Sequence, residues 1–231
     1  MTSGTPEPQW PKLLSLSVHE FRTPMTVVAG YIRMLLTDRA GALNDQQRRL
    51  LGEAEKSCAR LSGLLGEMSD LSNLEAGTAP FNRTRIDLRP LLAEAVAGLP
   101  ELPDREITVT LTTGPGAALI EGDPVRLRTA IGSVLGALRR ELVTSLELSV
   151  RERNGQFEGR PASWITIADP DRVGGLEVET PESLTTFDEW RGGCGLGLAV
   201  ARRIINTHGG AVWSPPGEGT KAGAVIVLPR A

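Results

Sequence analysis

The stretch LLSLSVHEFRTPMTVVAGYIRMLLTD, residues 13–38, is dense in apolar residues and decides the fold of the N-terminal part of the chain. A second such segment runs from Asn44 to about Ala76, where apolar residues recur at intervals of three and four: Leu50, Ala54, Cys58, Leu61, Leu65 and Met68. This spacing is typical of amphipathic helices. In the connection TDRAGALND, Gly41 suits a helix exit and Asn44 or Asp45 can cap the next helix. The two segments therefore predict a helical hairpin.

Two helices with wide apolar faces cannot cover each other completely. The usual remedy is a symmetric pair of hairpins that forms a four-helix bundle, so we predict a homodimer. Residues 1–12, MTSGTPEPQWPK, are rich in Pro, Ser and Thr and are expected to be a tail or a linker.

The sequence pattern changes after Gly77, at the short linker TAPFNRTRID. Helices are predicted at about 87–97, 123–142 and 196–207, and strands at 107–113, 116–123, 143–150, 164–168 and 222–229. Helices and strands in this order predict an α/β sandwich, with helices over a mixed sheet. The expected fold class is α+β: a helical hairpin, forming a dimeric bundle, followed by an α/β sandwich.

The composition excludes several classes of protein. The 231 residues are 40% hydrophobic and 23% charged, with a net charge of −3 and both signs scattered along the chain, so no basic surface for nucleic acid is expected. No apolar run approaches the roughly 20 residues that cross a bilayer, and we expect a cytoplasmic protein. The two cysteines, Cys58 and Cys194, lack metal-ligand spacing and are expected to be free thiols.

Residues 17–25, SVHEFRTPM, concentrate the chemistry. An imidazole titrates near neutrality, so the unprotonated nitrogen of His19 can attack a phosphorus, while the carboxylate of Glu20 fixes the tautomer and takes up the proton. Thr23 shares a helix face with His19, four residues earlier, and could orient a water for the reverse hydrolysis. Pro24 lacks a backbone N–H and is expected to bend the helix just past His19.

The string H-E-x-R-T-P on the first helix of a hairpin closely resembles the H-box of two-component histidine kinases, and the resemblance extends from about Leu13 to Pro229. It implies a dimerisation and phosphoacceptor domain at residues 13–78, with His19 as the phosphorylated residue. It also implies a Bergerat-type ATP-binding domain at residues 83–231, and a response-regulator receiver domain as the partner.

Residues 193–199, GCGLGLA, resemble the G2 box of the same family, whose glycines let backbone N–H groups approach phosphates. The resemblance makes Gly193, Gly195 and Gly197 nucleotide-binding residues. It also makes Asp169, which follows the strand ITIA, the residue that hydrogen-bonds the adenine amino group. His208, in the string HGG, is expected to be structural.

Other motifs depart from the family pattern. The resemblance places Ser133 and Ala137 where the family has asparagines, one of which is a magnesium ligand. An alanine methyl offers Mg²⁺ no oxygen, so Ser133, or Glu141 one turn later, is the remaining candidate donor. No other metal site is predicted.

The G1 and lid regions also differ from the family. Asp171 and Val173 stand where glycines are expected, with Arg172 as a candidate partner for Asp171. Very few residues separate Phe187 from Gly193, so almost no ATP lid is expected.

Two functions follow from these features. The chain is a histidine kinase that uses ATP and Mg²⁺ to phosphorylate His19, or a histidine phosphotransferase that exchanges phosphoryl groups with receiver domains without ATP. The complete H-box and the G2 glycines favour the first, whereas Ala137, the G1 substitutions and the missing lid favour the second. A dimeric scaffold with an idle His19 ranks below both, because nothing in the H-box is altered.

Overall fold

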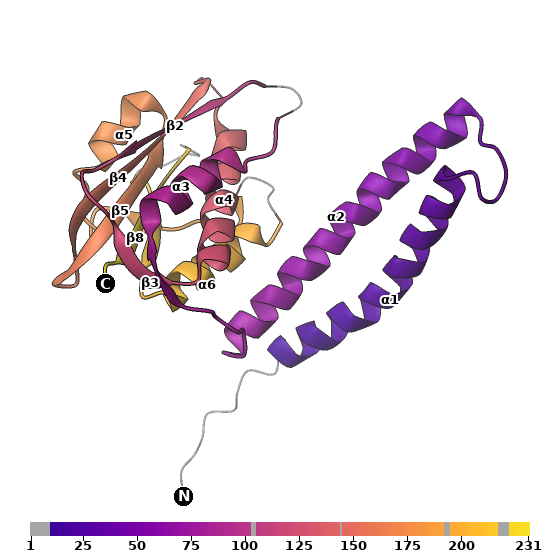
Figure 1. The fold of residues 1–231 in the computed structure, drawn as a ribbon, viewed down its shortest axis with the longest axis horizontal. Helices are drawn as coiled ribbons and strands as arrows, with labels where there is room; N and C mark the ends of the chain where they lie inside the picture. The colour runs from indigo at the N-terminus through magenta and orange to yellow at the C-terminus, as the bar shows by residue number, and fades with distance from the viewer. Residues whose placement is uncertain (1–9, 103–104, 144, 192–194, 217–221) are drawn as a thin grey trace, which may run out of the picture. The chain divides into compact units, whose positions relative to one another are not determined.

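The computed structural model describes residues 10–102, 105–143, 145–191, 195–216 and 222–231. The chain divides into two compact units, Met1–Ala79 and Pro80–Ala231, each of which is described by itself (Figure 1).

The first unit is a helical hairpin of α1 (Trp10–Leu36) and α2 (Asp45–Glu75), as predicted. Helix α2 begins with a capping box, in which the Asn44 side chain accepts from the Gln47 N–H and the Gln47 side chain accepts from the Asn44 N–H. At the turn, the Arg48 guanidinium donates to the Asp38 carboxylate at 2.9 Å and to the Leu36 carbonyl at 3.0 Å. These contacts fix where the chain reverses.

Helix α1 continues through Pro24 to Leu36 without a break. Its ribbon curves along its length, whereas that of α2 is nearly straight (Figure 1). At the open end of the hairpin, the Ser72 hydroxyl donates to the Pro11 carbonyl at 2.6 Å. This bond connects the start of α1 to the last turns of α2.

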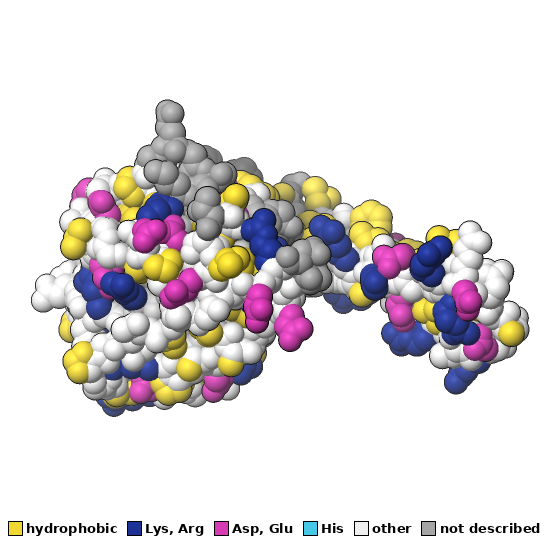
Figure 2. Space-filling model, turned by 90° about the horizontal axis from the view of Figure 1, so that it is seen from above, with side chains coloured by type: hydrophobic (Ala, Val, Ile, Leu, Met, Phe, Trp, Pro, Cys, Tyr) yellow, Lys and Arg dark blue, Asp and Glu magenta, His cyan; other side chains and the backbone are white. Residues whose placement is uncertain are grey.

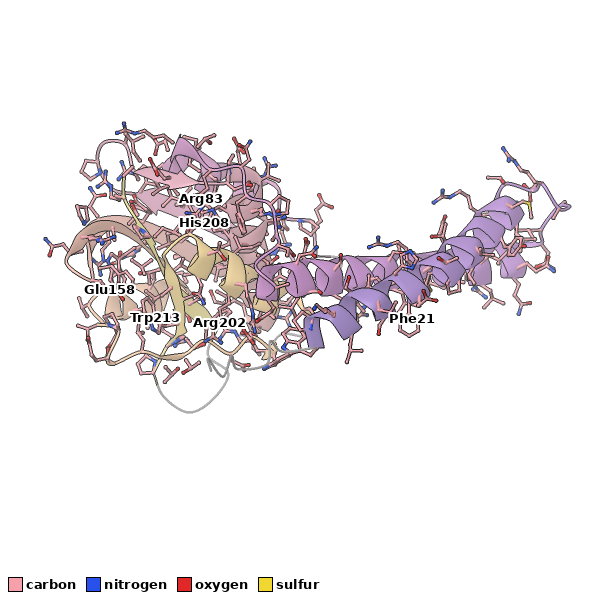
Figure 3. The ribbon with its side chains drawn as sticks, turned by 90° about the horizontal axis from the view of Figure 1, so that it is seen from below. Phe21, Arg83, Glu158, Arg202, His208 and Trp213 are labelled. Atoms are coloured by element: carbon pink, nitrogen blue, oxygen red, sulfur yellow. The ribbon has the colours of Figure 1, made fainter. Side chains whose placement is uncertain are left out.

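The hairpin leaves much of its apolar surface uncovered. Leu16 is 60% exposed and Tyr31 is 61% exposed, and both lie on α1 with other exposed apolar residues: Leu13, Phe21, Val27, Val28 and Met34. Figure 2 shows apolar side chains reaching the surface of the hairpin among charged ones, and Figure 3 shows the Phe21 ring projecting away from α1. A single hairpin therefore buries only part of what its helices could bury.

The second unit is an α/β domain whose elements are as follows. The helices are α3 (Leu88–Ala97), α4 (Pro124–Glu141), α5 (Pro170–Leu176) and α6 (Gly197–Thr207). The strands are β1 (Thr84–Asp87), β2 (Thr108–Thr113), β3 (Leu119–Gly122), β4 (Glu147–Phe157), β5 (Arg160–Ala168), β6 (Thr185–Thr186), β7 (Ala211–Ser214) and β8 (Gly223–Pro229).

Six strands form one mixed sheet in the order β2-β4-β5-β8-β7-β6. The β2–β4 pair is parallel and the other pairs are antiparallel. Strands β1 and β3 form a separate antiparallel pair. The predicted helices over a mixed sheet are confirmed.

One face of the sheet is covered by the long helices. Ile165 and Ile167 on β5 are fully buried, and alternation along the strand directs them to the face that carries α3, α4 and α6 (Figure 1). Helix α4 is almost apolar on its inner side and packs against both α3 and α6. Its side chains therefore occupy the centre of the helical layer.

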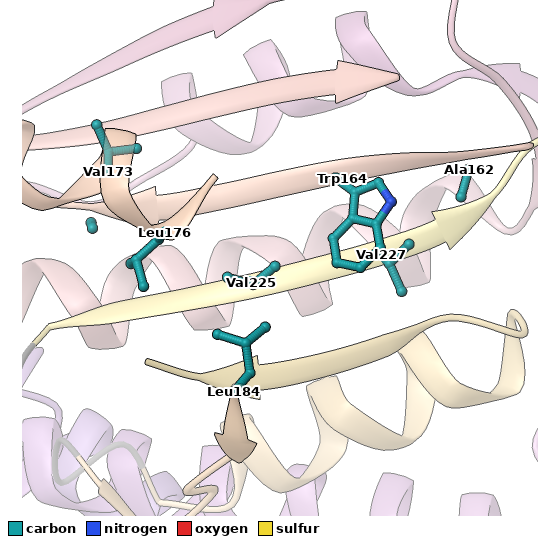
Figure 4. Close-up of a cluster of buried hydrophobic side chains, with 8 residues drawn as sticks. Ala162, Trp164, Val173, Leu176, Leu184, Val225 and Val227 are labelled. Carbon is teal, nitrogen blue, oxygen red and sulfur yellow. The ribbon is translucent and has the colours of Figure 1, made fainter. Parts of the chain in front are cut away.

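The opposite face is covered by α5. Trp164 and Ala168 on β5 form a buried cluster with Val173 and Leu176 on α5 (Figure 4). The sequence analysis misses this helix, because it assigns residues 169–173 to the altered G1 turn of the family pattern. It also missed the short strands β1, β6 and β7, and it ended the strand at 143–150 too early, since β4 extends to Phe157.

Candidate functional site

His19 lies on α1 with its side chain 77% exposed. The neighbouring Glu20 side chain is 72% exposed, and its Oε1 lies 3.3 Å from His19 Nδ1. When Nδ1 carries the proton, it donates to this carboxylate and leaves Nε2 with a free lone pair. The pair thus presents a nucleophilic nitrogen to solvent.

The helix itself determines this exposure. Val18, the residue before His19, is 3% exposed and faces the inside of the hairpin, so His19 and Glu20 turn outward. Thr23 lies one turn after His19 and is also exposed. His19 and Thr23 therefore share an accessible helix face, as the spacing of four residues predicts.

Helix α4 carries the positions that resemble the N-box. Asp123 caps the helix by accepting from the Val125 and Arg126 N–H groups. Burial raises the pKa of this carboxyl, but the backbone hydrogen bonds it accepts lower the pKa more. Ala137 is fully buried, whereas Ser133 is half-buried and lines a pocket of about 370 Å³ between α3 and α4.

Glu141 ends α4 with a buried ion pair. Its Oε1 lies 3.6 Å from Nε of Arg191, and the two side chains are 10% and 8% exposed respectively. Burial raises the pKa of Glu141, while the Arg191 charge lowers it and the nearby Asp188 raises it. The carboxylate considered as a metal donor therefore faces a guanidinium.

Asp169 occupies the start of α5, directly after β5. Its Oδ2 lies 3.7 Å from Nη1 of Arg172, with the side chains 18% and 28% exposed. The sequence suggested Arg172 as a partner for Asp171, but the structure pairs it with Asp169, because the two lie three residues apart on the first turn of a helix. The group expected to bind adenine thus already has a cationic neighbour.

The structure describes two of the three predicted G2 glycines. Gly195 has φ +65°, a conformation that suits glycine, and Gly197 begins α6. The third predicted residue, Gly193, lies outside the described residues. Two of the three positions therefore lie at the N-terminus of a helix, where backbone N–H groups are available to an anion.

His208 has a structural environment. Its Nε2 accepts from the Asp123 N–H at 3.0 Å, its Nδ1 lies 2.7 Å from the Ile204 carbonyl, and Phe81 makes an edge contact with the ring. Both ring nitrogens are engaged only in the neutral tautomer with hydrogen on Nδ1. Burial lowers the pKa of His208, in keeping with this neutral form, although the Ile204 hydrogen bond raises it.

The residues present at α4 do not fit a magnesium ion. Mg²⁺ requires oxygen ligands in octahedral geometry, but Ala137 offers none, Glu141 faces Arg191, and Ser133 offers a single hydroxyl in the pocket between α3 and α4. Across the part of the chain that the structure describes, no cluster of three or more His, Cys, Asp or Glu side chains could hold a metal ion.

The chain combines a helical hairpin, which carries an exposed histidine beside a carboxylate, with an α/β unit. Residues 12–77 match the model of the His Kinase A (phospho-acceptor) domain family. The chain is 27% identical over 225 residues to the sensor protein GacS of Pseudomonas syringae pv. syringae, which covers 92% of this chain and 24% of GacS. It is also 27% identical to the sensor-like histidine kinase SenX3 of Mycolicibacterium smegmatis, over 87% of this chain and 53% of SenX3.

Solved structures share the fold. Full-length ShkA, crystallised in complex with AMPPNP, has a TM-score of 0.67 and 22% identity over 96% of this chain and 46% of ShkA. The histidine kinase AdeS of Acinetobacter baumannii has a TM-score of 0.55 and 16% identity over 92% of this chain and 97% of that chain. The chain is thus similar to sensor histidine kinases over most of its own length, and it spans about a quarter of the length of the GacS relative. Among the described helices, none has the length and apolar character needed to cross a membrane.

The sequence reasoning missed the role of Arg191. Glu141 was considered only as a substitute metal ligand, and no partner for it was named. The one signal available was the charged string DEWR in place of a lid, but only the fold brings residue 191 to the end of α4.

Proposed function

We propose that this chain transfers a phosphoryl group through His19 to an aspartate of a response-regulator receiver domain. The observation that carries the proposal is the exposed His19 ring, whose Nδ1 lies 3.3 Å from the Glu20 carboxylate. This pairing fixes the tautomer and leaves Nε2 accessible to a second protein.

The chemistry follows from the two nitrogens. The Nε2 lone pair attacks the phosphorus of a phosphoryl donor, the bond from phosphorus to the donor oxygen breaks, and its electron pair leaves with that oxygen. Glu20 stabilises the Nδ1 proton while the ring carries positive charge. A receiver carboxylate then attacks the phosphorus, and the N–P electron pair returns to Nε2. Thr23, on the same face, is proposed to orient a water in the competing hydrolysis.

The donor distinguishes two forms of this function. In the histidine-kinase form, ATP held by the α/β unit phosphorylates His19, as the relatives and the G2 glycines suggest. In the phosphotransferase form, a phosphorylated receiver is the donor. The buried Ala137, the Glu141–Arg191 pair and the Asp169–Arg172 pair favour the second form, because they engage or remove the groups that would hold a metal nucleotide.

We further propose that the chain acts as a cytoplasmic homodimer. The exposed apolar side chains of α1, among them Leu16 and Tyr31, support a second hairpin as the partner. Analytical ultracentrifugation should find a dimer. Replacement of both residues by glutamate should give a monomer.

The proposed transfer is tested with two donors. Purified protein is incubated separately with γ-labelled ATP plus Mg²⁺ and with a labelled receiver domain, with His19→Ala as the control. Acid-labile label that depends on His19 supports the proposal, and the donor that supplies it identifies the form. If neither donor labels the protein and the receiver does not bind, the proposed function is wrong.

A further inference from the structure

Residues 187–191, FDEWR, connect β6 to the region of the G2 glycines and are held at both ends. At the first end, the Phe187 side chain is 2% exposed and the Asp188 N–H donates to the Ser214 hydroxyl at 3.2 Å. At the other end, Arg191 donates to the Gly223 carbonyl at 2.7 Å and lies over the Phe187 ring, 5.3 Å from its centroid. We call these five residues the strap.

The strap joins two helices of the domain. Glu189, 9% exposed, accepts from both Arg202 and Arg203 of α6, and Figure 3 shows Arg202 on this helix. Arg191 pairs with Glu141 at the end of α4. Ion pairs through one short segment thus connect the C-terminal end of α4 to the middle of α6.

The strap also contacts β8, beside the end of β5 that precedes Asp169. Gly223, whose carbonyl accepts from Arg191, pairs in the sheet with Ala168, the residue before Asp169. The guanidinium therefore lies near two positions that the resemblance relates to nucleotide binding: the end of β5, and the helix turn after Ala137.

The ion pairs of Glu141 and Glu189 oppose any movement of the strap away from the two helices. Both Glu141 carboxylate oxygens are buried without a hydrogen-bond partner among the described residues, so the Arg191 charge is the main compensation shown for them. A buried carboxylate that loses its cation is strongly destabilised. Lifting the strap would have to hydrate or protonate Glu141 and, at the same time, separate Glu189 from α6.

We propose that the strap is an internal latch that closes the nucleotide-type site, with the Arg191 guanidinium supplying positive charge beside Glu141 where a metal nucleotide would otherwise bind. This inference rests on the resemblance of the α/β unit to an ATP-binding domain and is independent of phosphotransfer through His19. The misfit of magnesium at α4 and the absence of a long lid then have one explanation: the site is occupied by the chain itself.

The test is a nucleotide titration of the full chain with AMPPNP, with and without Mg²⁺, by isothermal calorimetry. The double variant Glu141→Gln/Arg191→Ala removes both charges and vacates the guanidinium volume. It avoids the unpaired buried carboxylate that Arg191→Ala alone would leave. Arg160→Met, an exposed arginine on β5, is the matched control. The double variant should bind AMPPNP at least tenfold more tightly than wild type, and the control should match wild type.

Hydrogen exchange provides a second readout. In wild type, peptides covering residues 187–191 should exchange slowly and equally with or without AMPPNP, and in the double variant they should exchange faster. Tight Mg²⁺-dependent binding by wild type that the double variant loses would overturn the latch, because Arg191 would then be a nucleotide contact. Transfer from a labelled receiver to His19 is measured on the same proteins, and its failure would count against the proposed function only.

Discussion

Replacing Ala137 by asparagine restores the side chain that the N-box resemblance implies. The structure predicts that this change lowers the stability of the fold and does not create a metal site. Ala137 is fully buried in the helical layer. Extra heavy atoms in a filled core cost about 1–3 kcal/mol, and a buried amide without hydrogen-bond partners costs about 1–3 kcal/mol more. The free energy of unfolding should therefore fall by about 2–6 kcal/mol, which corresponds to a Tm lower by roughly 4–24 °C.

Urea unfolding followed by tryptophan emission measures this change, because Trp164 and Trp213 stack with ring centroids 5.9 Å apart inside the α/β unit. Ser133→Asn is the matched control: its site is half-buried at the pocket between α3 and α4, so the change should stay within about 1 kcal/mol. A stable Ala137→Asn protein that gains Mg²⁺-dependent labelling of His19 would refute the reasoning, since the position would then be open to a ligand.

Three further changes test the α/β unit. Arg89→Ala should lower the free energy of unfolding by about 3–5 kcal/mol in urea, because the fully buried Glu152 loses its partner at 2.8 Å; replacing both residues by apolar ones should recover most of the loss. His208 accepts from the Asp123 N–H and has a lowered pKa in the folded state, so its stabilising effect is complete above about pH 6.5 and declines as the pH falls and the unfolded chain takes up the proton. The difference in stability between wild type and His208→Gln should accordingly shrink from pH 7.5 to pH 5.5, and a constant difference would contradict this account. Gly210→Ala should be destabilised by at least about 1–3 kcal/mol in thermal unfolding, because its Cβ would overlap a backbone carbonyl of β8.

The hairpin could be predicted from the sequence because its determinants are local. The apolar spacing, the Asn44 cap and the exposure of His19 depend on neighbours within about four residues on one helix. The placement of Glu20 and Thr23 relative to His19 follows from the same geometry. The sequence also predicts that some apolar residues of α1 stay exposed in a single hairpin, since two helices alone cannot cover wide apolar faces.

For the nucleotide-type site of the α/β unit, the sequence predicts only which groups of the family pattern are missing. The resemblance places Ala137 where the family has a polar residue, and it predicts almost no lid. It does not reveal that Arg191 reaches Glu141, fifty positions earlier, because that contact depends on the order of strands in the sheet. Helix α5 was missed for a related reason: its apolar residues Val173 and Leu176 complete a cluster on β5 and β8 that is visible only in three dimensions.

The contrast between the two units has a physical basis. The phosphotransfer proposed at His19 needs a few groups on one helical face, so it would tolerate changes elsewhere in the chain. A nucleotide site needs groups from α4, β5 and α6 to converge around an empty volume, and such a volume costs stability unless a ligand fills it. Here arginines form ion pairs with carboxylates of the α/β unit, as in the Glu141–Arg191 and Glu189–Arg203 pairs. In the latch that we propose, a nucleotide would have to separate these ion pairs before it could bind.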